Sequence, residues 1–457
     1  MKKKNITFIF NSFLLTHLLT WTLIPFFSNK NLPLDVIEAL AWGTNLDWGW
    51  DKHPPLSVFF PEFFYQLFGN QDWAYYLLSQ IFIIFSFIAV FNLAKEFLKN
   101  ETYALLSVFL LEGIYFYNFT TPEFNVNVCQ IPFWSLTIYY SWQSFKDNKA
   151  HNWILFGLFA GLGVLSKYLF VYLLIGINFF FIYHLKKNKK FNFKYFIPII
   201  VFLLVLSPHL RWLVDNDYKT ITYGLKRTSL ESSTFLSHFI YPLKFIFKQI
   251  VTLLPFFILL KLILKKNFKF KFNQRDEKSI FLILTTFVPI LLMFITSLVF
   301  AANIRTMWMT PFYLFFGLFF IYHFKTNINL NFLKRFMFGF LFIFILSPVA
   351  YLYISISEDN KRTDYPGKEI AYLVQNRWDK NFVNNIAIIV GDEWVGGNLS
   401  YHLQSRPRWF YNLEPKLKNL NLNGGVIYVG NADILKSVCP GEFGSIKSQG
   451  ICMIGTR

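Results

Sequence analysis

Long apolar runs separated by short polar segments make up most of this chain. Most of the runs are roughly 18 to 25 residues long, enough for a helix to cross a hydrocarbon core of about 30 Å. The pattern predicts eleven membrane-spanning helices, at residues 6–27, 74–94, 102–119, 125–143, 152–166, 168–185, 195–212, 239–264, 279–300, 307–324 and 336–356. We therefore expect a mostly α-helical, polytopic membrane protein.

The pattern changes after residue 356, where long apolar runs stop and Gly, Asn and charged residues become more frequent. Residues 364–378 have the spacing of an amphipathic helix, and its expected apolar face holds Ile370, Leu373 and Val374. This helix would be the first element of a separate C-terminal domain.

Two short apolar runs in this region, 386–390 and 426–429, are each followed by Gly and predict buried strands. About 100 residues are enough for a domain to build its own core. The chain is therefore expected to have a transmembrane domain at residues 1–356 and a small α/β domain at residues 357–457.

Charge adds an orientation to this outline. The chain has 457 residues and a net charge of +18, which by itself would suit nucleic-acid binding. The basic residues instead gather between the apolar runs, as topology signals do. Segments on the side of the N-terminus hold 21 Lys and Arg, against 8 in the opposite loops before the C-terminal domain. We predict a cytoplasmic N-terminus, an extracytoplasmic C-terminal domain and no nucleic-acid partner.

The N-terminus is expected to remain part of the first spanning helix. Residues 2–4 are basic and precede the first apolar run, but no small-residue cleavage site follows it. The sequence also contains no P-loop, no Rossmann fingerprint and no HExxH motif, so the handling of soluble nucleotides is not supported.

The first predicted outer loop, residues 28–73, combines carboxylates with Trp42, Trp48 and Trp50. Asp35 and Glu38 would share one face of a helix. A solvated surface helix would show the same pair. However, a carboxylate at a membrane boundary is costly without a partner or a task, which favours a functional role.

The same loop contains Asp51, Lys52 and His53 directly before Pro54 and Pro55. The two prolines fix an extended turn that re-aims the chain into the next helix. His53, held beside this turn, is a candidate for contact with a phosphate or a carboxylate, and Asp51 and Lys52 are candidates for substrate binding beside it.

Further candidates lie in other predicted outer loops. Glu123 suits the first turn of a helix, but its very short loop also places it at the membrane level of Asp35. Lys167, Arg227 and Arg305 could bind phosphate, although Lys167 could simply snorkel and scattered Arg residues are often only surface charge.

Two other features concern packing. Glu112 lies inside the third predicted span, where we expect an intramembrane hydrogen-bonding role. Cys439 and Cys452 can form a disulfide if the C-terminal domain is extracytoplasmic, and two unrelated thiols are the alternative. Cys129, in an apolar helix, is expected to serve packing alone.

These features, in this order, resemble the polyprenyl-phosphate-dependent glycosyltransferases of the GT-C fold. This superfamily includes the dolichyl-phosphate-mannose protein mannosyltransferases and the bacterial aminoarabinose transferase of lipid A. The resemblance covers roughly residues 1–330 and rests on segments 34–43, 49–56, 121–123 with 133–134, 161–168 and 207–212, and on Arg305 with Trp308.

The resemblance implies roles for individual residues. The catalytic acidic residue of the first outer loop falls on Asp35, and the acidic residue that opens the second outer loop falls on Glu123. Many relatives have Asp at the second place and two adjacent acidic residues in the first loop. This chain has Glu123 there and separates Asp35 from Glu38 by two residues.

The function implied is transfer of a sugar from a polyprenyl-phosphate donor to an envelope acceptor, lipid A or core lipopolysaccharide, at the periplasmic face of a bacterial inner membrane. A carboxylate would activate the acceptor and cations would stabilise the departing lipid phosphate. A protein O-glycosyltransferase and a lipid-linked sugar flippase are the alternatives. Transporters usually carry charge near the bilayer midplane, whereas most polar residues here lie at one face. No cofactor is certain, and a divalent metal is left open.

Overall fold

The computed structural model describes residues 3–189, 191–228, 234–266, 276–412, 424–446 and 449–457. Part of the basic segments used above to predict orientation, at residues 1–2, 190 and 267–275, lies outside the described residues. The chain divides into two compact units. The first contains residues 1–24, 48–56 and 79–353, and the second contains residues 25–47, 57–78 and 354–457.

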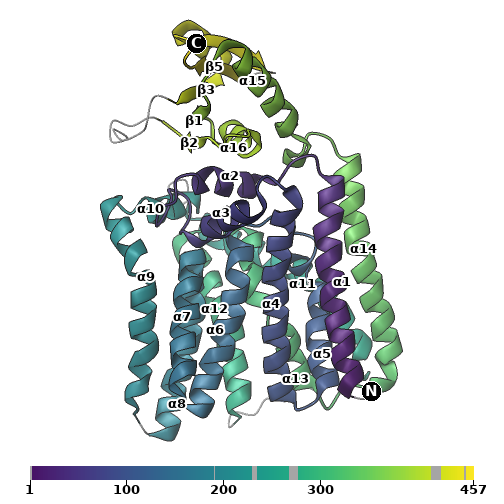
Figure 1. Cartoon of the computed structure of the whole chain (residues 1–457). Coiled ribbons are helices and arrows are strands. Elements are labelled where there is room, and N and C mark those ends of the chain that lie inside the picture. Colours follow the sequence, from purple (N-terminus) through teal and green to yellow (C-terminus); the bar gives the residue numbers. More distant parts are fainter. Residues whose placement is uncertain (1–2, 190, 229–233, 267–275, 413–423, 447–448) are drawn as a thin grey trace. The chain divides into compact units, whose positions relative to one another are not determined.

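The first unit is built from helices that run side by side (Figure 1). Its α-helices, and the 3-10 helices labelled η, are α1 (Lys3–Ser28), α4 (Asp72–Leu98), α5 (Glu101–Phe109), η1 (Leu110–Gly113), η2 (Tyr115–Tyr117), α6 (Val126–Asp147), α7 (Ala150–Ser166), η3 (Tyr168–Phe170), α8 (Val171–Asn188), η4 (Phe193–Phe196), α9 (Ile197–Asp215), α10 (Lys219–Arg227), α11 (Ser237–Ile263), α12 (Glu277–Phe300), η6 (Thr306–Tyr313), α13 (Phe316–Phe324), η7 (Leu330–Phe332) and α14 (Leu333–Ser357). A few end residues of α1, α4 and α14 fall in the second unit.

Seven helical segments among the described residues are long and apolar enough to cross a membrane, and a bent pair makes a possible eighth. The seven segments are Asn5–Ser28, Asp72–Leu98, Tyr168–Asn188, Phe193–Asp215, Ser237–Ile263, Glu277–Phe300 and Leu330–Ser357, and the bent pair is η6 with α13. The other three predicted spans fall on α5, α6 and α7, which are helical but shorter or more polar. The prediction of a mostly helical membrane protein is confirmed.

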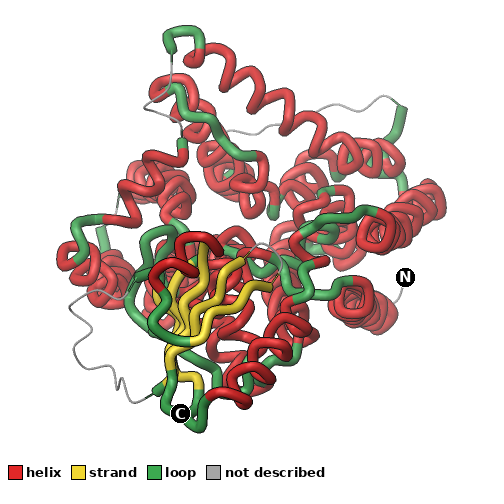
Figure 2. Tube along the Cα trace, turned by 90° about the horizontal axis from the view of Figure 1, so that it is seen from above, coloured by secondary structure: helices red, strands yellow, loops and turns green. Residues whose placement is uncertain are grey.

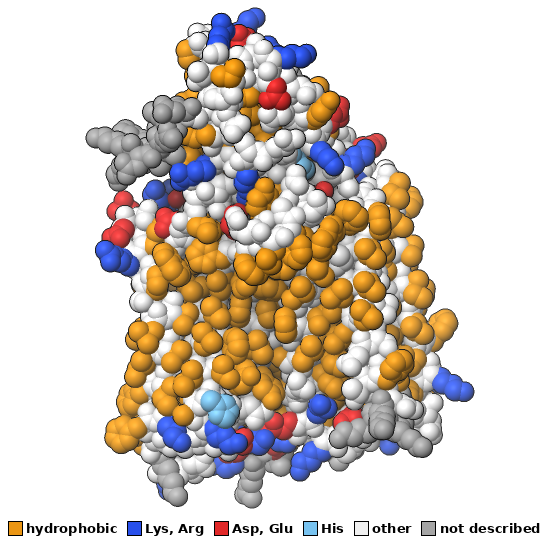
Figure 3. Space-filling model, viewed as in Figure 1, with side chains coloured by type: hydrophobic (Ala, Val, Ile, Leu, Met, Phe, Trp, Pro, Cys, Tyr) orange, Lys and Arg blue, Asp and Glu red, His pale blue; other side chains and the backbone are white. Residues whose placement is uncertain are grey.

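The outer surface of these helices is apolar in the middle. Figure 3 shows hydrophobic side chains covering the bundle and Lys and Arg gathering at its lower end. Large side chains such as Leu204, Phe247 and Phe338 are 67%, 67% and 76% exposed. Such a surface suits contact with lipid rather than water.

One predicted span is broken in the structure. The helix expected at residues 102–119 ends at Phe109 and continues as η1, and Ile114 is extended. Gly113 lies at the break, where an added Cβ would sit 2.6 Å from the Cα of Phe256 on α11. The two backbones approach each other closely here, which the missing side chain of Gly113 permits.

The second unit contains a small sheet and several helices. These elements are α2 (Leu34–Gly43), α3 (Leu56–Phe68), η8 (Arg362–Asp364), α15 (Gly367–Asn381), β1 (Ile386–Gly391), α16 (Glu393–His402), β2 (Arg408–Phe410), β3 (Gly425–Asn431), α17 (Ala432–Val438), β4 (Glu442–Ile446) and β5 (Gln449–Ile454). The strand order is β2-β1-β3-β5-β4. Figure 2 shows the strands of this sheet in yellow, lying side by side. β1 is parallel to β2 and β3, and β5 is antiparallel to β3 and β4.

The sequence predictions for this region hold with one correction. The two predicted strands are β1 and β3, and their side chains Ile388, Val390 and Val426 form a buried cluster. The predicted amphipathic helix is α15. Its buried stripe contains Ile370, Ala371, Val374 and Trp378. Leu373 falls beside this stripe and is 47% exposed, so its placement on the apolar face was wrong.

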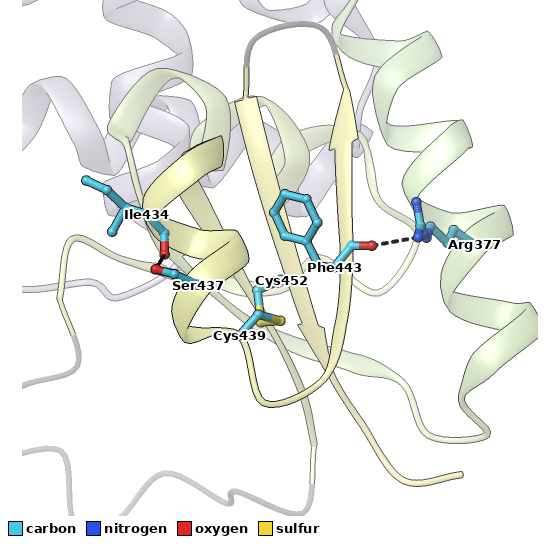
Figure 4. Close-up of a disulfide and its surroundings, with 6 residues drawn as sticks. All are labelled: Arg377, Ile434, Ser437, Cys439, Phe443 and Cys452. Carbon is cyan, nitrogen blue, oxygen red and sulfur yellow. Dashed lines mark hydrogen bonds between the residues drawn. A yellow bond between two sulfur atoms is a disulfide. The ribbon is translucent and has the colours of Figure 1, made fainter.

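The structure joins Cys439 and Cys452 in a disulfide (Figure 4). Cys439 directly follows α17 and Cys452 lies in β5, with their Cα atoms 5.7 Å apart. Close by, Arg377 of α15 donates a hydrogen bond of 2.7 Å to the carbonyl of Phe443 in β4. Cys129 is free and buried, as expected for a packing role.

Candidate functional site

The acidic pair of the second unit lies on α2. Asp35 occupies the first helical turn, where a carboxylate suits the positive end of the helix dipole. Asp35 and Glu38 are half-buried and share one side of the helix. On another side, Ile37 and Ala41 pack against Gly397 of α16. The helical arrangement expected for the pair is therefore present.

α2 is held by residues that are far away in the sequence. Trp42 Nε1 donates to Glu393 Oε1 at 2.6 Å, and Arg406 Nη2 donates to the carbonyl oxygen of Leu40 at 2.7 Å. Arg406 also forms a buried ion pair of 3.0 Å with Glu62 of α3. Sequence reasoning missed this framework because its partners are separated by more than 300 residues.

His402 completes the attachment of the segment that precedes α2. Its Nε2 lies 3.1 Å from Oδ1 of Asn31. Burial first, and then the charge of Lys368, lowers the pKa of His402 to about 4. The imidazole is therefore neutral at physiological pH, and its N–H can donate to the Asn31 oxygen.

In the first unit, three predicted substrate-binding residues, Lys52, Lys167 and Arg227, lie close enough to a fourth, His53, for their charges to act on it. Burial first, and then the positive charges of Lys167, Lys52 and Arg227, lowers the pKa of His53 to about 3. His53 is therefore a neutral imidazole beside three cations. We call Lys52, His53, Lys167 and Arg227 the cation cluster. Its positive field suits an anionic ligand.

Aromatic and amide side chains support two members of the cation cluster. Lys167 donates to Asn127 Oδ1 at 2.5 Å and lies 5.3 Å from the ring centre of Trp308. Arg227 lies 5.8 Å from the ring centre of Tyr223, which also meets His53 edge-on at 6.5 Å. Cation–π contacts of this kind hold a positive group without neutralising its charge.

A backbone hydrogen bond links the segment that carries Arg305 to the segment that carries Arg227. Arg305 is exposed and forms the N-cap of η6. Asn303, two residues earlier, donates its backbone N–H to the carbonyl of Thr228 at 3.1 Å, and Thr228 directly follows Arg227. The two segments that carry Arg227 and Arg305 are therefore neighbours.

The main chain leading to the cation cluster is fixed by α9 and α10. His209 Nδ1 lies 2.5 Å from the carbonyl oxygen of Trp48, and Thr220 donates to the carbonyl of Trp50 at 2.6 Å. Gly49, between them, packs against Trp212 so closely that an added Cβ would clash. The sequence indicated the segment 207–212, but not that its His209 anchors this loop.

The two remaining predicted site residues, Asp51 and Glu123, lie in loops. Asp51 is exposed in the loop before Lys52. Glu123 is half-buried between Pro122 and Phe124, just before α6, and thus lies before the helix rather than in its first turn. No group of three or more His, Cys, Asp or Glu side chains that could hold a metal ion occurs among the residues the structure describes.

Comparisons with known proteins agree with the resemblance seen in the sequence. Residues 52–212 match the family model described as dolichyl-phosphate-mannose-protein mannosyltransferase. This range includes Lys52, His53, Glu123 and Lys167. No curated protein matches the chain.

The fold is similar to two crystal structures of ArnT from Cupriavidus metallidurans. The structure bound to undecaprenyl phosphate gives a TM-score of 0.67 at 10% sequence identity, covering 99% of this chain and 98% of that one. The apo structure gives a TM-score of 0.62 at 10% identity, covering 97% and 98%. At this identity the likeness establishes the fold, which is the GT-C fold inferred from the sequence motifs.

Proposed function

We propose that this chain, which has a GT-C fold, is a membrane glycosyltransferase that moves a sugar from a polyprenyl phosphate to an acceptor of the cell envelope. The observation that carries the proposal is the cation cluster. Its members Lys52, His53 and Lys167 lie within the range of the family match, and a protein of the same fold is described with undecaprenyl phosphate bound.

The proposed chemistry uses the two kinds of charged group in different ways. Asp35, with Glu38 and Glu123 as further carboxylates, accepts the proton of the acceptor hydroxyl, whose oxygen attacks the anomeric carbon. The bond between that carbon and the phosphate oxygen breaks, and its electron pair stays on the leaving polyprenyl phosphate. The cation cluster and Arg305 stabilise this developing charge.

A cavity in the first unit has a lining that suits a lipid phosphate. Its volume is about 410 Å³, and it is lined by Tyr115, Phe247, Lys248, Val251, Thr252, Pro255 and Thr306. Lys248 is one of three exposed Lys residues of α11, with Lys244 and Lys261, among exposed side chains that are mostly apolar. Thr306 directly follows Arg305. We propose that the lipid part of the donor lies against this surface.

The proposed site of action is the periplasmic face of the inner membrane, with the N-terminus in the cytoplasm. The proposed acceptor is lipid A or core lipopolysaccharide. A protein acceptor uses the same chemistry, and a flippase of lipid-linked sugar is the alternative from another class. The charge distribution favours an enzyme, because the carboxylates and cations lie in predicted outer loops rather than at the middle of the spans.

Mass analysis of lipid A and envelope glycans from a deletion strain tests this proposal. We expect one sugar to be missing from an envelope component and to return with the wild-type gene but not with the Asp35→Asn variant. Loss from a protein instead would identify a protein O-glycosyltransferase. A missing sugar together with lipid-linked sugar retained in the cytoplasmic leaflet would favour a flippase, and an unchanged envelope would contradict the proposal.

A further inference from the structure

A buried ionisable pair in the first unit has no part in the proposed chemistry. Glu112 of η1 and His17 of α1 are 1% and 0% exposed, and His17 Nδ1 lies 3.0 Å from Glu112 Oε1. Phe13 and Phe87 surround the imidazole. Ionisable groups inside a membrane segment are costly and are retained where they have a task.

The pair is connected to the break that follows α5. Asn118 donates through Nδ2 to the carbonyl of Glu112 at 2.8 Å and to its Oε2 at 3.2 Å. The Oδ1 atom of Asn118 accepts from the N–H of Phe119 at 2.6 Å and from Ser347 of α14 at 3.2 Å. Asn118 thus supplies the hydrogen bonds that the backbone loses where the helix stops.

The connections continue to the candidate carboxylate Glu123. Thr121 donates both its N–H, at 3.0 Å, and its hydroxyl, at 2.6 Å, to the carbonyl of Asn118. Gln80 of α4 donates to the Thr121 hydroxyl at 3.0 Å. We call His17, Glu112, Asn118, Thr121 and Gln80 the polar chain. It ends two residues before Glu123.

The residues on the other side of Glu123 are also fixed. Phe124 is fully buried and packs edge-on against Phe82 of α4, with ring centres 5.2 Å apart. Asn125 caps α6 by accepting from the N–H groups of Asn127 and Val128. With the polar chain on one side and this cap on the other, the main chain at Glu123 has little freedom.

We propose that His17, Glu112 and Asn118 are positioning residues that hold Glu123 for sugar transfer. This inference rests on the proposed function, because that function is what gives Glu123 a reaction to serve. The three residues touch neither donor nor acceptor. Their effect is exerted through the backbone of residues 118–123, and a small displacement of a reacting group is enough to reduce a rate strongly.

The kinetic test is a double-mutant cycle between Asn118→Ala and Glu123→Gln, with polyprenyl-phosphate sugar as donor. Alone, Asn118→Ala should lower kcat about tenfold while the KM for donor stays within about twofold. In the Glu123→Gln background the same substitution should lower kcat by less than about twofold. An equal loss in both backgrounds would contradict positioning of Glu123.

Milder variants cover the case in which Asn118→Ala fails to fold. Thr121→Val removes one hydroxyl from the polar chain and should show the same non-additivity with Glu123→Gln. Thr285→Val is the matched control, because Thr285 is also buried and donates to a backbone carbonyl, that of Phe281. Equal losses of kcat in the two Thr variants would mean that the polar chain serves only packing and does not position Glu123.

Glu112 offers a conservative rescue. Glu112→Gln keeps an oxygen that accepts from Asn118 and should retain kcat within about threefold, whereas Glu112→Leu should behave like Asn118→Ala. If Glu112→Gln lost as much kcat as Glu112→Leu, the carboxylate charge rather than the connection would be what matters, and the proposal would be wrong.

A labelling experiment separates this inference from the proposed function. In a Glu123→Cys variant, reaction of the introduced thiol with a water-soluble maleimide measures access to position 123 without any sugar transfer. The background is low because Cys129 is buried and Cys439 is bonded to Cys452. Adding Asn118→Ala should change the labelling rate about fivefold or more, and adding Thr285→Val should not.

Unchanged labelling would overturn the positioning role even if the enzyme is active. Altered labelling with no sugar transfer by the wild type would remove only the proposed function.

Discussion

The two compact units hold their charged residues by different means. In the first unit, the cation cluster is supported by contacts within the bundle, such as Lys167 with Asn127 and Trp308. In the second unit, Asp35 and Glu38 lie on a short helix held by side chains more than 300 residues away, including Glu393 and Arg406. The comparison suggests that the acidic pair depends on the folded C-terminal region more than the cations do.

The largest expected effect on stability comes from breaking the Arg406–Glu62 pair. Arg406→Ala leaves the buried Glu62 carboxylate without its partner and removes the contact with Tyr65, whose ring centre is 3.9 Å from the guanidinium. We expect the second unit to lose about 3–5 kcal/mol. Thermal unfolding of the full chain measures this loss.

Arg457→Ala is the matched control, because Arg457 pairs with Glu442 at 2.8 Å while remaining 75% exposed. An exposed pair of this kind should contribute less than about 1 kcal/mol. Equal destabilisation by the two Arg variants would mean that the buried contacts of Arg406 do not hold the unit together.

The disulfide gives the next largest expected effect, and it is confined to the second unit. It closes a separation of 13 residues. Replacing both Cys439 and Cys452 by Ser should cost about 3 kcal/mol according to the chain-entropy model. Thermal unfolding with and without reductant should show the same loss for the wild type. Non-reducing peptide mapping that finds both thiols free would contradict the pairing.

The cation cluster should affect donor use more than stability. Lys167→Gln keeps a polar group near Asn127 but removes the charge, and it should raise the KM for donor about tenfold. Arg211→Gln is the control, since Arg211 is an exposed cation paired with Asp215. A changed sugar in the product with an unchanged KM would contradict a phosphate-binding role for Lys167.

An effect that appears only at low pH is expected from one neutral histidine in each unit. The lowered pKa values of His53 and His402 mean that the unfolded chain binds protons more readily than the folded chain. Each residue therefore reduces stability as the pH falls below its ordinary pKa of about 6.5.

His53→Asn and His402→Asn should each flatten the decline of the melting temperature between about pH 6.5 and pH 4. Thermal unfolding across this range is the measurement. A decline as steep in the variants as in the wild type would show that these imidazoles are not held neutral by the fold.

The sequence could locate much of this architecture because its signals are local. Apolar run lengths predicted the helical bundle, and Cys439 and Cys452 are close in sequence, so their pairing could be considered at once. The break after Phe109 could not be predicted, because it lies where Gly113 approaches Phe256, a residue 143 positions further along the chain.

The residues of the candidate site also fall into two groups, those with a local sequence signal and those without one. Motif residues such as Asp35, His53 and Lys167 could be selected from their segments. The residues that hold them could not. His209, Thr220 and Arg406 act on main-chain carbonyls, and a carbonyl has no signature in the sequence. The supporting framework therefore required the structure.

The proposed function gives Asp35 a direct part in sugar transfer from a polyprenyl-phosphate donor. The most direct measurement is the discharge of such a donor, prepared from envelope lipids, by the purified chain in lipid nanodiscs, followed by mass spectrometry. The wild type should release polyprenyl phosphate only when acceptor is present. Asp35→Asn should react about a hundredfold or more slowly at an unchanged melting temperature, and Asp359→Asn, at an exposed position, should react normally. Discharge by Asp35→Asn at the wild-type rate would contradict this role of Asp35.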